Sequence, residues 1–253
     1  MNTQDILTNI SCGSWIQSGS PAIGEIMACV GFDWVCIDLE HTDVDWNTFS
    51  HIIRAIKRYQ TIPMARVSSN EPLAIRKPLD FGAMGVIIPL VNNAEDAQRA
   101  VTAAKYPPEG IRGFAFCQAN EWGEAFDEYS ANANDSIIVI VMIETREAVE
   151  NIEEILAVEG VNGVIIGPYD LTGSYGIPGQ TSHPIMTLAK EKVLTSCRKH
   201  AKLAGQHIVF PTKENIAQAV KEGYEFLALG MDTVFIAEGS KNVLSFAKCD
   251  EHP

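Results

Sequence analysis

Short apolar stretches alternate with amphipathic helical stretches along almost the whole chain, and this alternation limits the possible folds more than any other feature. Strands are expected at residues 11–17, 34–38, 63–67, 85–89, 137–143, 164–166, 206–209 and 226–229. Helices are expected between and after them, at residues 20–30, 45–59, 72–81, 93–105, 146–157, 184–203, 213–222 and from residue 233 onward. Eight strands that are each followed by a helix predict an α/β fold, a parallel sheet closed into a (β/α)8 TIM barrel.

The length agrees with one barrel domain over residues 1–253, because such barrels commonly contain about 250 residues. No Pro/Ser-rich linker or low-complexity run divides the chain. A doubly wound open sheet is the alternative, but no Gly-x-Gly-x-x-Gly turn follows the first strand. The longest irregular stretch, residues 106–134, is expected to be functional or an insertion.

Charge and hydrophobicity exclude several classes of partner. The formal net charge is −13, and the acidic residues are spread along the chain. Because phosphate backbones are bound through clustered Lys and Arg, we expect no nucleic-acid partner. The N-terminal residues lack the basic start and apolar core of a signal peptide, and no apolar run is long enough to cross a bilayer. We therefore expect no membrane partner and a cytoplasmic location.

The cysteines indicate the same compartment. None is paired in a Cys-x-x-Cys motif, and several lie inside apolar strand or helix patterns. A thiol in such a position behaves as a small core residue. We predict reduced thiols, without a disulfide framework or structural zinc, at Cys12, Cys29, Cys36, Cys117, Cys197 and Cys249.

Ionisable side chains gather where the predicted strands end. Pro168 cannot donate to a sheet ladder, so the strand at 164–166 must stop before it. Active sites of (β/α)8 barrels lie at the carboxyl ends of the strands. The residues at these ends are Asp38, Glu40, His41, Arg66, Glu144, Tyr169 and Asp170. The alternative, that they are ordinary polar loop residues, stays open.

The residue types at this rim favour metal-assisted chemistry. Two carboxylates, Glu144 and Asp170, suit a hard divalent ion such as Mg²⁺ or Mn²⁺, which would leave positions for water and a chelating 2-oxo acid. Arg66 could stabilise an enolate, and His41 could move protons directly or through a bound water. No lysine follows a strand directly, which argues against a Schiff base.

Several motifs, taken in order, resemble the metal-dependent (class II) pyruvate aldolases of the HpcH/HpaI family. The likeness covers nearly the whole chain. It lies in Gly-Phe-Asp-Trp (31–34), Ile-Asp-Leu-Glu-His (37–41), Pro-Met-Ala-Arg-Val (63–67), Leu-Asp-Phe-Gly-Ala (79–83), Tyr-Pro-Pro (106–108), Gly-Ile-Arg-Gly (110–113), Ile-Glu-Thr (143–145), Val-Glu-Gly-Val (158–161), Gly-Pro-Tyr-Asp-Leu (167–171) and His-Pro (183–184).

The resemblance implies a barrel of the phosphoenolpyruvate/pyruvate-domain type with a defined set of site residues. Glu144 and Asp170 would be metal ligands, for Mg²⁺, Mn²⁺ or Co²⁺. His41 would be the acid/base and Arg66 the enolate-stabilising residue. Backbone amides at Tyr169 and Asp170 would bind the substrate carboxylate.

The resemblance also implies an assembly and a partner for the histidine. Family members form hexamers in which the C-terminal helix is exchanged between subunits, so we expect a homo-oligomer, a hexamer or trimer. The histidine is supported by a carboxylate, possibly from an adjoining subunit, which points to Asp38 or Asp80.

Three positions depart from the family pattern. Met142 stands where many members have a glutamine that helps bind pyruvate, and Thr42 stands where Ala or Gly is usual. Residues 205–209, Gly-Gln-His-Ile-Val, differ from the Gly-Ile-Leu-like sequence of the sugar-acid aldolases. These changes leave the metal and proton chemistry in place and bear on the identity of the substrates.

The sequence therefore predicts an enzyme, a carbon–carbon lyase. It would cleave a 4-hydroxy-2-oxo acid reversibly to pyruvate and an aldehyde through a metal-stabilised enolate. The alternatives are an acyl-CoA lyase of the citrate-lyase or malyl-CoA type, a decarboxylase or other enolate-forming enzyme, and a catalytically silent 2-oxo-acid-binding protein. The acyl-CoA alternative would need a basic patch for the CoA phosphates, whereas Met142 motivates the silent binder.

Overall fold

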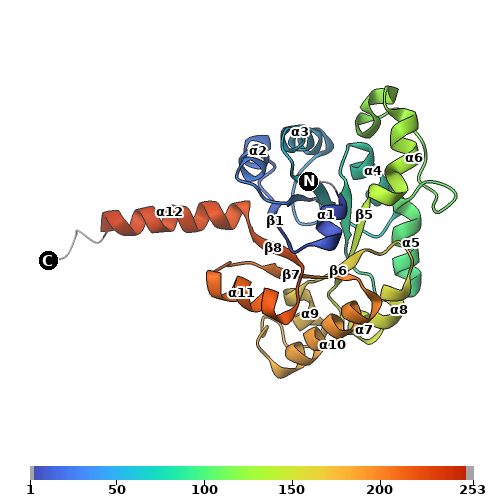
Figure 1. Cartoon of the computed structure of the whole chain (residues 1–253). Helices are drawn as coiled ribbons and strands as arrows, with labels where there is room; N and C mark the ends of the chain where they lie inside the picture. The colour runs from blue at the N-terminus through green and yellow to red at the C-terminus, as the bar shows by residue number, and fades with distance from the viewer. Residues whose placement is uncertain (1–2, 249–253) are drawn as a thin grey trace.

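The computed structural model describes residues 3–248 and forms a closed barrel of parallel strands arranged in chain order (Figure 1). The predicted (β/α)8 fold is confirmed. The strands are β1 (Ser11–Ile16), β2 (Trp34–Asp38), β3 (Ile62–Arg66), β4 (Gly85–Ile88), β5 (Ile138–Ile143), β6 (Gly163–Ile166), β7 (Leu203–Ile208) and β8 (Phe226–Met231).

Helices surround the barrel and connect successive strands (Figure 1). They are α1 (Thr3–Thr8), α2 (Pro21–Cys29), α3 (Trp46–Ile56), α4 (Pro72–Asp80), α5 (Ala94–Ala104), η1 (Gln118–Gly123), α6 (Phe126–Ser136), α7 (Arg146–Glu150), α8 (Ile152–Ala157), α9 (Pro168–Ser174), α10 (Pro184–His200), α11 (Lys213–Glu222) and α12 (Asp232–Lys248). Side-chain caps begin several of them, as at Asp45, which accepts a hydrogen bond from the Thr48 amide at 2.7 Å.

Large aromatic side chains fill the lower barrel interior. The rings of Trp34 and Phe226 stack with centroids 4.2 Å apart and an interplanar angle of 4°. Gly13 on β1 makes room for them, since a Cβ there would lie 1.9 Å from the Trp34 ring. Below them α1, which the sequence patterns did not reveal, inserts the fully buried Ile6. This end of the barrel interior is thus filled by packed side chains, as is usual for a (β/α)8 barrel.

The interval 106–134 was predicted to be irregular, and this is wrong for its second half. It contains the 3₁₀ helix η1 and the first two turns of α6. The α6 sequence is rich in Asn, Asp and Ser, which favour turns over helix interiors and hide the helix from propensity. Packing of Tyr129 and Ala133 against the core stabilises it.

Three other boundaries differ from the prediction. The helix expected at 146–157 is broken at Asn151, whose side chain leaves the helix to donate to the Asn92 carbonyl at 3.0 Å. The helix expected to end at residue 203 stops at His200, because Ala201 adopts a left-handed conformation, and β7 begins at Leu203. Helix α9, which starts directly after Gly167, lies where the sequence patterns predict neither a helix nor a strand.

The C-terminal helix α12 extends away from the barrel (Figure 1). It carries apolar side chains that are more than half exposed at Ile236, Val243, Leu244 and Phe246. Within the described part of the chain, no helix is both long and apolar enough to span a bilayer.

Candidate active site

A pocket of about 390 Å³ opens where the carboxyl ends of the strands meet. Its floor is formed by inward side chains from the odd-numbered strands, namely Trp15 of β1, Arg66 of β3, Met142 of β5 and His207 of β7. Barrel interiors are usually filled by such layers from alternate strands. We call these side chains the floor layer.

Arg66 of the floor layer forms a buried ion pair with Asp38. Arg66 Nε donates to Asp38 Oδ1 at 2.9 Å and Nη2 donates to Oδ2 at 2.6 Å, a bidentate geometry. Burial alone would raise the pKa of Asp38. The hydrogen bonds and positive charge of Arg66 lower it by more, so the net pKa lies below its usual value. The guanidinium carbon lies 4.9 Å from the centroid of the Trp15 ring. These contacts hold Arg66 in one orientation at the pocket edge.

Glu144 follows β5 and is almost fully buried, with 5% of the residue exposed. Its Oε1 accepts a hydrogen bond from the Leu90 amide at 2.7 Å, and Leu90 adopts a left-handed backbone conformation with φ of 55°. Gly167 permits the close approach, because a Cβ there would lie 3.1 Å from Glu144 Oε2. Burial, with the nearby charges of Glu40 and Asp170, raises the pKa of Glu144 to about 7 despite the Leu90 hydrogen bond.

Asp170 and Tyr169 lie in the first turn of α9, directly after β6, and both line the pocket. Pro168 occupies the first helical position, where its missing N–H costs no hydrogen bond. This early helix start directs the exposed Asp170 toward the acidic side of the pocket, where its charge acts on Glu144. The adjoining strands β5 and β6 therefore each supply one carboxylate.

His41 lines the pocket from the loop after β2, and its side chain is 61% exposed. The nearest carboxylate oxygen that pairs with its ring is Glu40 Oε2, 3.7 Å from Nε2. Asp38 accepts hydrogen bonds from the backbone amides of Glu40 and His41, at 3.1 and 3.3 Å, rather than from the ring. Thr42 donates its hydroxyl to the Asp38 carbonyl and so tightens this turn.

Within one chain, Asp80 is not among the residues at the rim pocket. It ends α4, beside the start of β4, and accepts a hydrogen bond from Arg112 Nη2 at 2.8 Å. Arg112 is fully enclosed, with Tyr106 and Tyr129 rings against its guanidinium. The barrel thus gathers Asp38, Glu144 and Asp170 at the rim but does not bring Asp80 to them.

Comparison with known proteins decides the family. A family model described as HpcH/HpaI aldolase/citrate lyase matches residues 11–238. The chain belongs to this HpcH/HpaI family. Aldolases and citrate lyases act on carbon–carbon bonds, so the fold and rim belong to a family of carbon–carbon lyases.

Individual relatives agree with this HpcH/HpaI membership. A protein of Shigella sonnei (strain Ss046) named 4-hydroxy-2-oxo-heptane-1,7-dioate aldolase is 39% identical over 232 residues, covering 90% of this chain and 87% of the relative. The crystal structure of a family protein from Burkholderia cenocepacia J2315 is 29% identical with a TM-score of 0.92, and the match covers 97% and 98% of the two chains. The crystal structure of citrate synthase SbnG is 31% identical with a TM-score of 0.85, covering 97% and 96%.

The oxygen ligands available in this HpcH/HpaI protein fit a hard cation whose coordination shell is completed mainly by water and substrate. Among residues 3–248, no cluster of three or more His, Cys, Asp or Glu side chains is arranged to hold a metal. The rim instead offers two carboxylates, Glu144 and Asp170, whose mutual repulsion a divalent ion would relieve. Mg²⁺ is commonly bound through one or two carboxylates, with water and substrate oxygens completing its shell.

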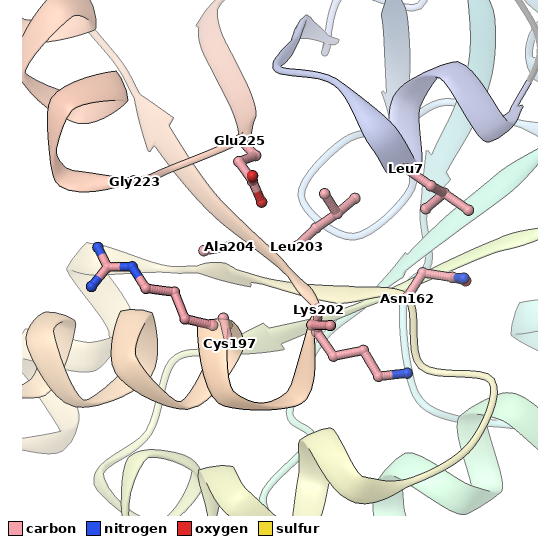
Figure 2. A pocket seen from close by; sticks show the side chains of 10 residues that line it. Leu7, Asn162, Cys197, Lys202, Leu203, Ala204, Gly223 and Glu225 are labelled. Carbon is pink, nitrogen blue, oxygen red and sulfur yellow. The ribbon is translucent and has the colours of Figure 1, made fainter.

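A larger cavity, of about 540 Å³, lies at the opposite end of the barrel (Figure 2). Its cationic side chains are engaged with the backbone, since Lys202 donates to the Val161 carbonyl and Arg198 to the Glu222 carbonyl. It borders Asn162 and Leu203, where β6 and β7 begin. Catalysis in (β/α)8 enzymes takes place at the other end, so the rim pocket is the candidate active site of this HpcH/HpaI member.

Two floor-layer residues were not identified as site residues from the sequence. Trp15 belongs to an apolar strand pattern, and its inward direction could have been read from the alternation along β1. His207 had been noted only as part of a divergent segment. The predicted strand at 206–209 contained His207, but the sequence did not show that its side chain lines the pocket.

Proposed function

We propose that this protein is a metal-dependent class II aldolase that cleaves a 4-hydroxy-2-oxo acid reversibly to pyruvate and an aldehyde. The observation that carries the proposal is that Glu144, after β5, and Asp170, after β6, lie close enough for their charges to interact at the rim whose pocket Arg66 and His41 line. The Shigella sonnei relative, which is named an aldolase for 4-hydroxy-2-oxo-heptane-1,7-dioate, supports this reaction class.

The residue roles follow from their positions. A divalent ion held by Glu144 and Asp170, either Mg²⁺, Mn²⁺ or Co²⁺, would supply Lewis-acid polarisation of the substrate's keto group. The amides of Tyr169 and Asp170 bind the substrate carboxylate. Arg66 has both Nε and Nη2 on Asp38, and within residues 3–248 its Nη1 makes no hydrogen bond, which leaves this donor for the developing enolate oxygen.

Proton transfer is assigned to His41. In cleavage, His41 accepts the proton of the C4 hydroxyl, the C3–C4 bond breaks, and its electron pair forms the enolate of pyruvate. A proton then returns to C3 to give the methyl group. Asp38 positions Arg66 and the His41 backbone, while Met142 contributes only apolar surface to the site. Asp80 supports His41 only if it comes from another subunit, since within one chain it pairs with Arg112.

A second candidate is an acyl-CoA lyase or citrate-forming reaction, which the similarity to citrate synthase SbnG favours. The same rim would serve, because both reactions pass through an enolate. Among residues 3–248, the pocket lining contains one arginine, Arg66, and no lysine, so it offers few cationic groups for the phosphates of CoA. The aldolase assignment therefore takes precedence.

We also propose a homo-oligomer, a hexamer or trimer, in which α12 packs on a second copy of this chain. The helix extends beyond its own barrel and exposes Ile236, Val243, Leu244 and Phe246. Light scattering should give a multiple of the 27.6 kDa chain mass, and replacing Val243 and Phe246 by serine should reduce that mass. We place the protein in the cytoplasm, where the free thiols of the described cysteines would stay reduced; Cys249 lies outside the described residues.

Proton NMR of pyruvate in deuterated buffer tests the proposed function. Metal-stripped protein should leave the methyl signal intact, and added Mg²⁺ or Mn²⁺ should cause its loss as C3 exchanges with solvent. Glu144→Ala should abolish the exchange. Exchange by no divalent ion, despite measured metal binding, would contradict the assignment and favour the acyl-CoA lyase or the silent binder.

A further inference from the structure

The floor layer contains a polar group that the proposed aldolase mechanism does not use. His207 is half-buried and lines the pocket. Its ring packs beside Trp15, with centroids 5.6 Å apart. Its neighbour on the other side of the floor, Met142, offers no strong hydrogen-bonding group.

The hydrogen bonding of His207 fixes which nitrogen carries the proton. Nε2 lies 3.3 Å from the Gly230 carbonyl oxygen, which can only accept, so Nε2 is the N–H donor. Burial lowers the pKa of His207 to about 4, and the nearby charge of Arg66 acts in the same direction, so the ring is neutral. Nδ1 is then a hydrogen-bond acceptor, and it makes no hydrogen bond within residues 3–248.

The surroundings show what this acceptor would recognise. The pocket near His207 is lined by apolar side chains, including Ile165, Val209 and Met231. The indole Nε1–H of Trp15 is also buried without an acceptor in the described part of the chain. An unpaired acceptor in an apolar floor favours a ligand group that donates a hydrogen bond, such as a hydroxyl, and disfavours an alkyl group of similar size.

When a 2-oxo acid binds at this rim, its C3 substituent is the part that can contact the floor layer. In the proposed site the amides of Tyr169 and Asp170 bind the carboxylate and Arg66 faces the keto oxygen. We infer that the C3 substituent then lies toward the pocket wall formed by His207 of β7 and Trp15 of β1. We propose that His207 is a specificity-determining residue that, among 2-oxo acids substituted on C3, selects those carrying a hydroxyl there over those carrying an alkyl group. This inference rests on the proposed aldolase function.

Hydrogen exchange at C3 tests the inference with three probes: pyruvate, hydroxypyruvate and 2-oxobutanoate. In each, a C3–H bond breaks, its electron pair enters the enolate, the proton passes to solvent and a deuteron from D₂O replaces it. The wild-type protein should exchange hydroxypyruvate with a kcat/KM about 10-fold above that for 2-oxobutanoate, the value of one hydrogen bond. Protein-free samples with the same metal correct for spontaneous exchange.

Variants separate the acceptor from a packing role. His207→Leu removes the acceptor and should abolish the preference between the two substituted acids. His207→Asn keeps an acceptor oxygen near the Nδ1 position and should retain part of it. His51→Leu, an exposed position on α3, is the matched control and should behave as the wild type. Because the readout is a ratio between two substrates, a general loss of folded protein cannot mimic it.

The outcomes distinguish this inference from the function on which it rests. If pyruvate exchanges but hydroxypyruvate is not preferred over 2-oxobutanoate, or if that preference survives in His207→Leu, the role of His207 is overturned and the aldolase assignment stays intact. Exchange of none of the acids with any divalent ion overturns both. A preference lost in His207→Leu and restored in part by His207→Asn supports the proposal.

Discussion

Two buried arginine–aspartate pairs, Arg66–Asp38 and Arg112–Asp80, show how similar chemistry can serve different purposes. In both, an arginine nitrogen lies within 2.8 Å of a carboxylate oxygen. Both guanidiniums also lie against an aromatic ring, at 4.9 Å from Trp15 for Arg66 and at 4.5 Å from Tyr106 for Arg112. The ion-pair distances and the aromatic contacts therefore do not distinguish the two arginines.

The pairs differ in what surrounds the arginine. The Arg66 side chain is 14% exposed and borders the rim pocket, whereas Arg112 is fully enclosed and gives a further hydrogen bond to the Tyr129 hydroxyl. Arg66 therefore keeps a donor for substrate, while Arg112 holds the loop after α5 against α4. Access to the pocket, rather than the ion pair itself, separates a functional arginine from a structural one.

The largest expected effect is on activity at Arg66. Arg66→Lys keeps a positive charge beside Asp38 but cannot both hold the carboxylate and present a second donor to the pocket. We expect kcat/KM for aldol cleavage to fall by about 10²–10³-fold, as for loss of one oxyanion-stabilising donor. Arg112→Lys is the matched control, and its activity per folded molecule should equal the wild type. Equal losses in both variants would contradict the comparison.

Next in size is the stability effect at Arg112. Arg112→Met removes the charge, both cation–π contacts and the hydrogen bond to Tyr129, and leaves Asp80 with the longer, 4.0 Å contact to Arg76. Because Asp80 is 23% exposed and can be hydrated, we expect the lower end of the range for a broken buried pair, about 3 kcal/mol. Urea denaturation would measure it. A change below about 1 kcal/mol would show that the enclosed pair adds little, as surface pairs do.

The pH dependence of stability sharpens the comparison at Asp38. Its pKa is lowered in the folded state, where burial alone would raise it but Arg66 lowers it more. The unfolded state then binds more protons near its ordinary pKa of 3.8, so this stabilisation is present above that value and is lost as pH falls through the folded pKa. The stability difference between wild type and Asp38→Asn should shrink as pH is lowered from 6 to about 3. A constant difference would argue against the charge interaction.

The smallest effect belongs to an exposed pair. Arg146 Nε lies 2.7 Å from Glu150 Oε1 on α7, and the two side chains are 65% and 55% exposed. Water and salt screen such a pair, so Arg146→Ala should leave both the melting temperature and the activity unchanged within error. A clear loss of stability in differential scanning fluorimetry would mean that distance predicts the strength of a pair better than burial does.

The sequence predicted the parts of the molecule that depend on local patterns. The strand ends at Asp38 and before Glu144 were predicted correctly, because apolar runs stop there and ionisable residues follow, and the end of β3 at Arg66 was predicted to within one residue. The start of β7 could not be predicted, since Ala201 and Lys202 are good helix formers and only the left-handed turn at Ala201 ends α10.

Local sequence patterns could not predict which side chains form pairs. Asp38 and Asp80 were equal candidates for support of His41, because neither spacing nor composition tells which carboxylate meets which cation. In the folded barrel Asp38 pairs with Arg66 and Asp80 pairs with Arg112, because elements distant in sequence pack together. The place of His207 in the pocket also results from closure of the barrel and could not be predicted from its neighbours in sequence.

The most direct test of the account is whether Glu144 and Asp170 hold a divalent ion together. Mn²⁺ binding, followed by electron paramagnetic resonance of the free ion, would be measured for the wild type, Glu144→Gln, Asp170→Asn and Asp80→Asn. The account predicts one site per chain that weakens by at least about 10-fold in either rim variant, as for other residues at a metal site, and stays unchanged in Asp80→Asn. Mn²⁺ binding that is equal in all four proteins would contradict the assignment of the rim as the metal site.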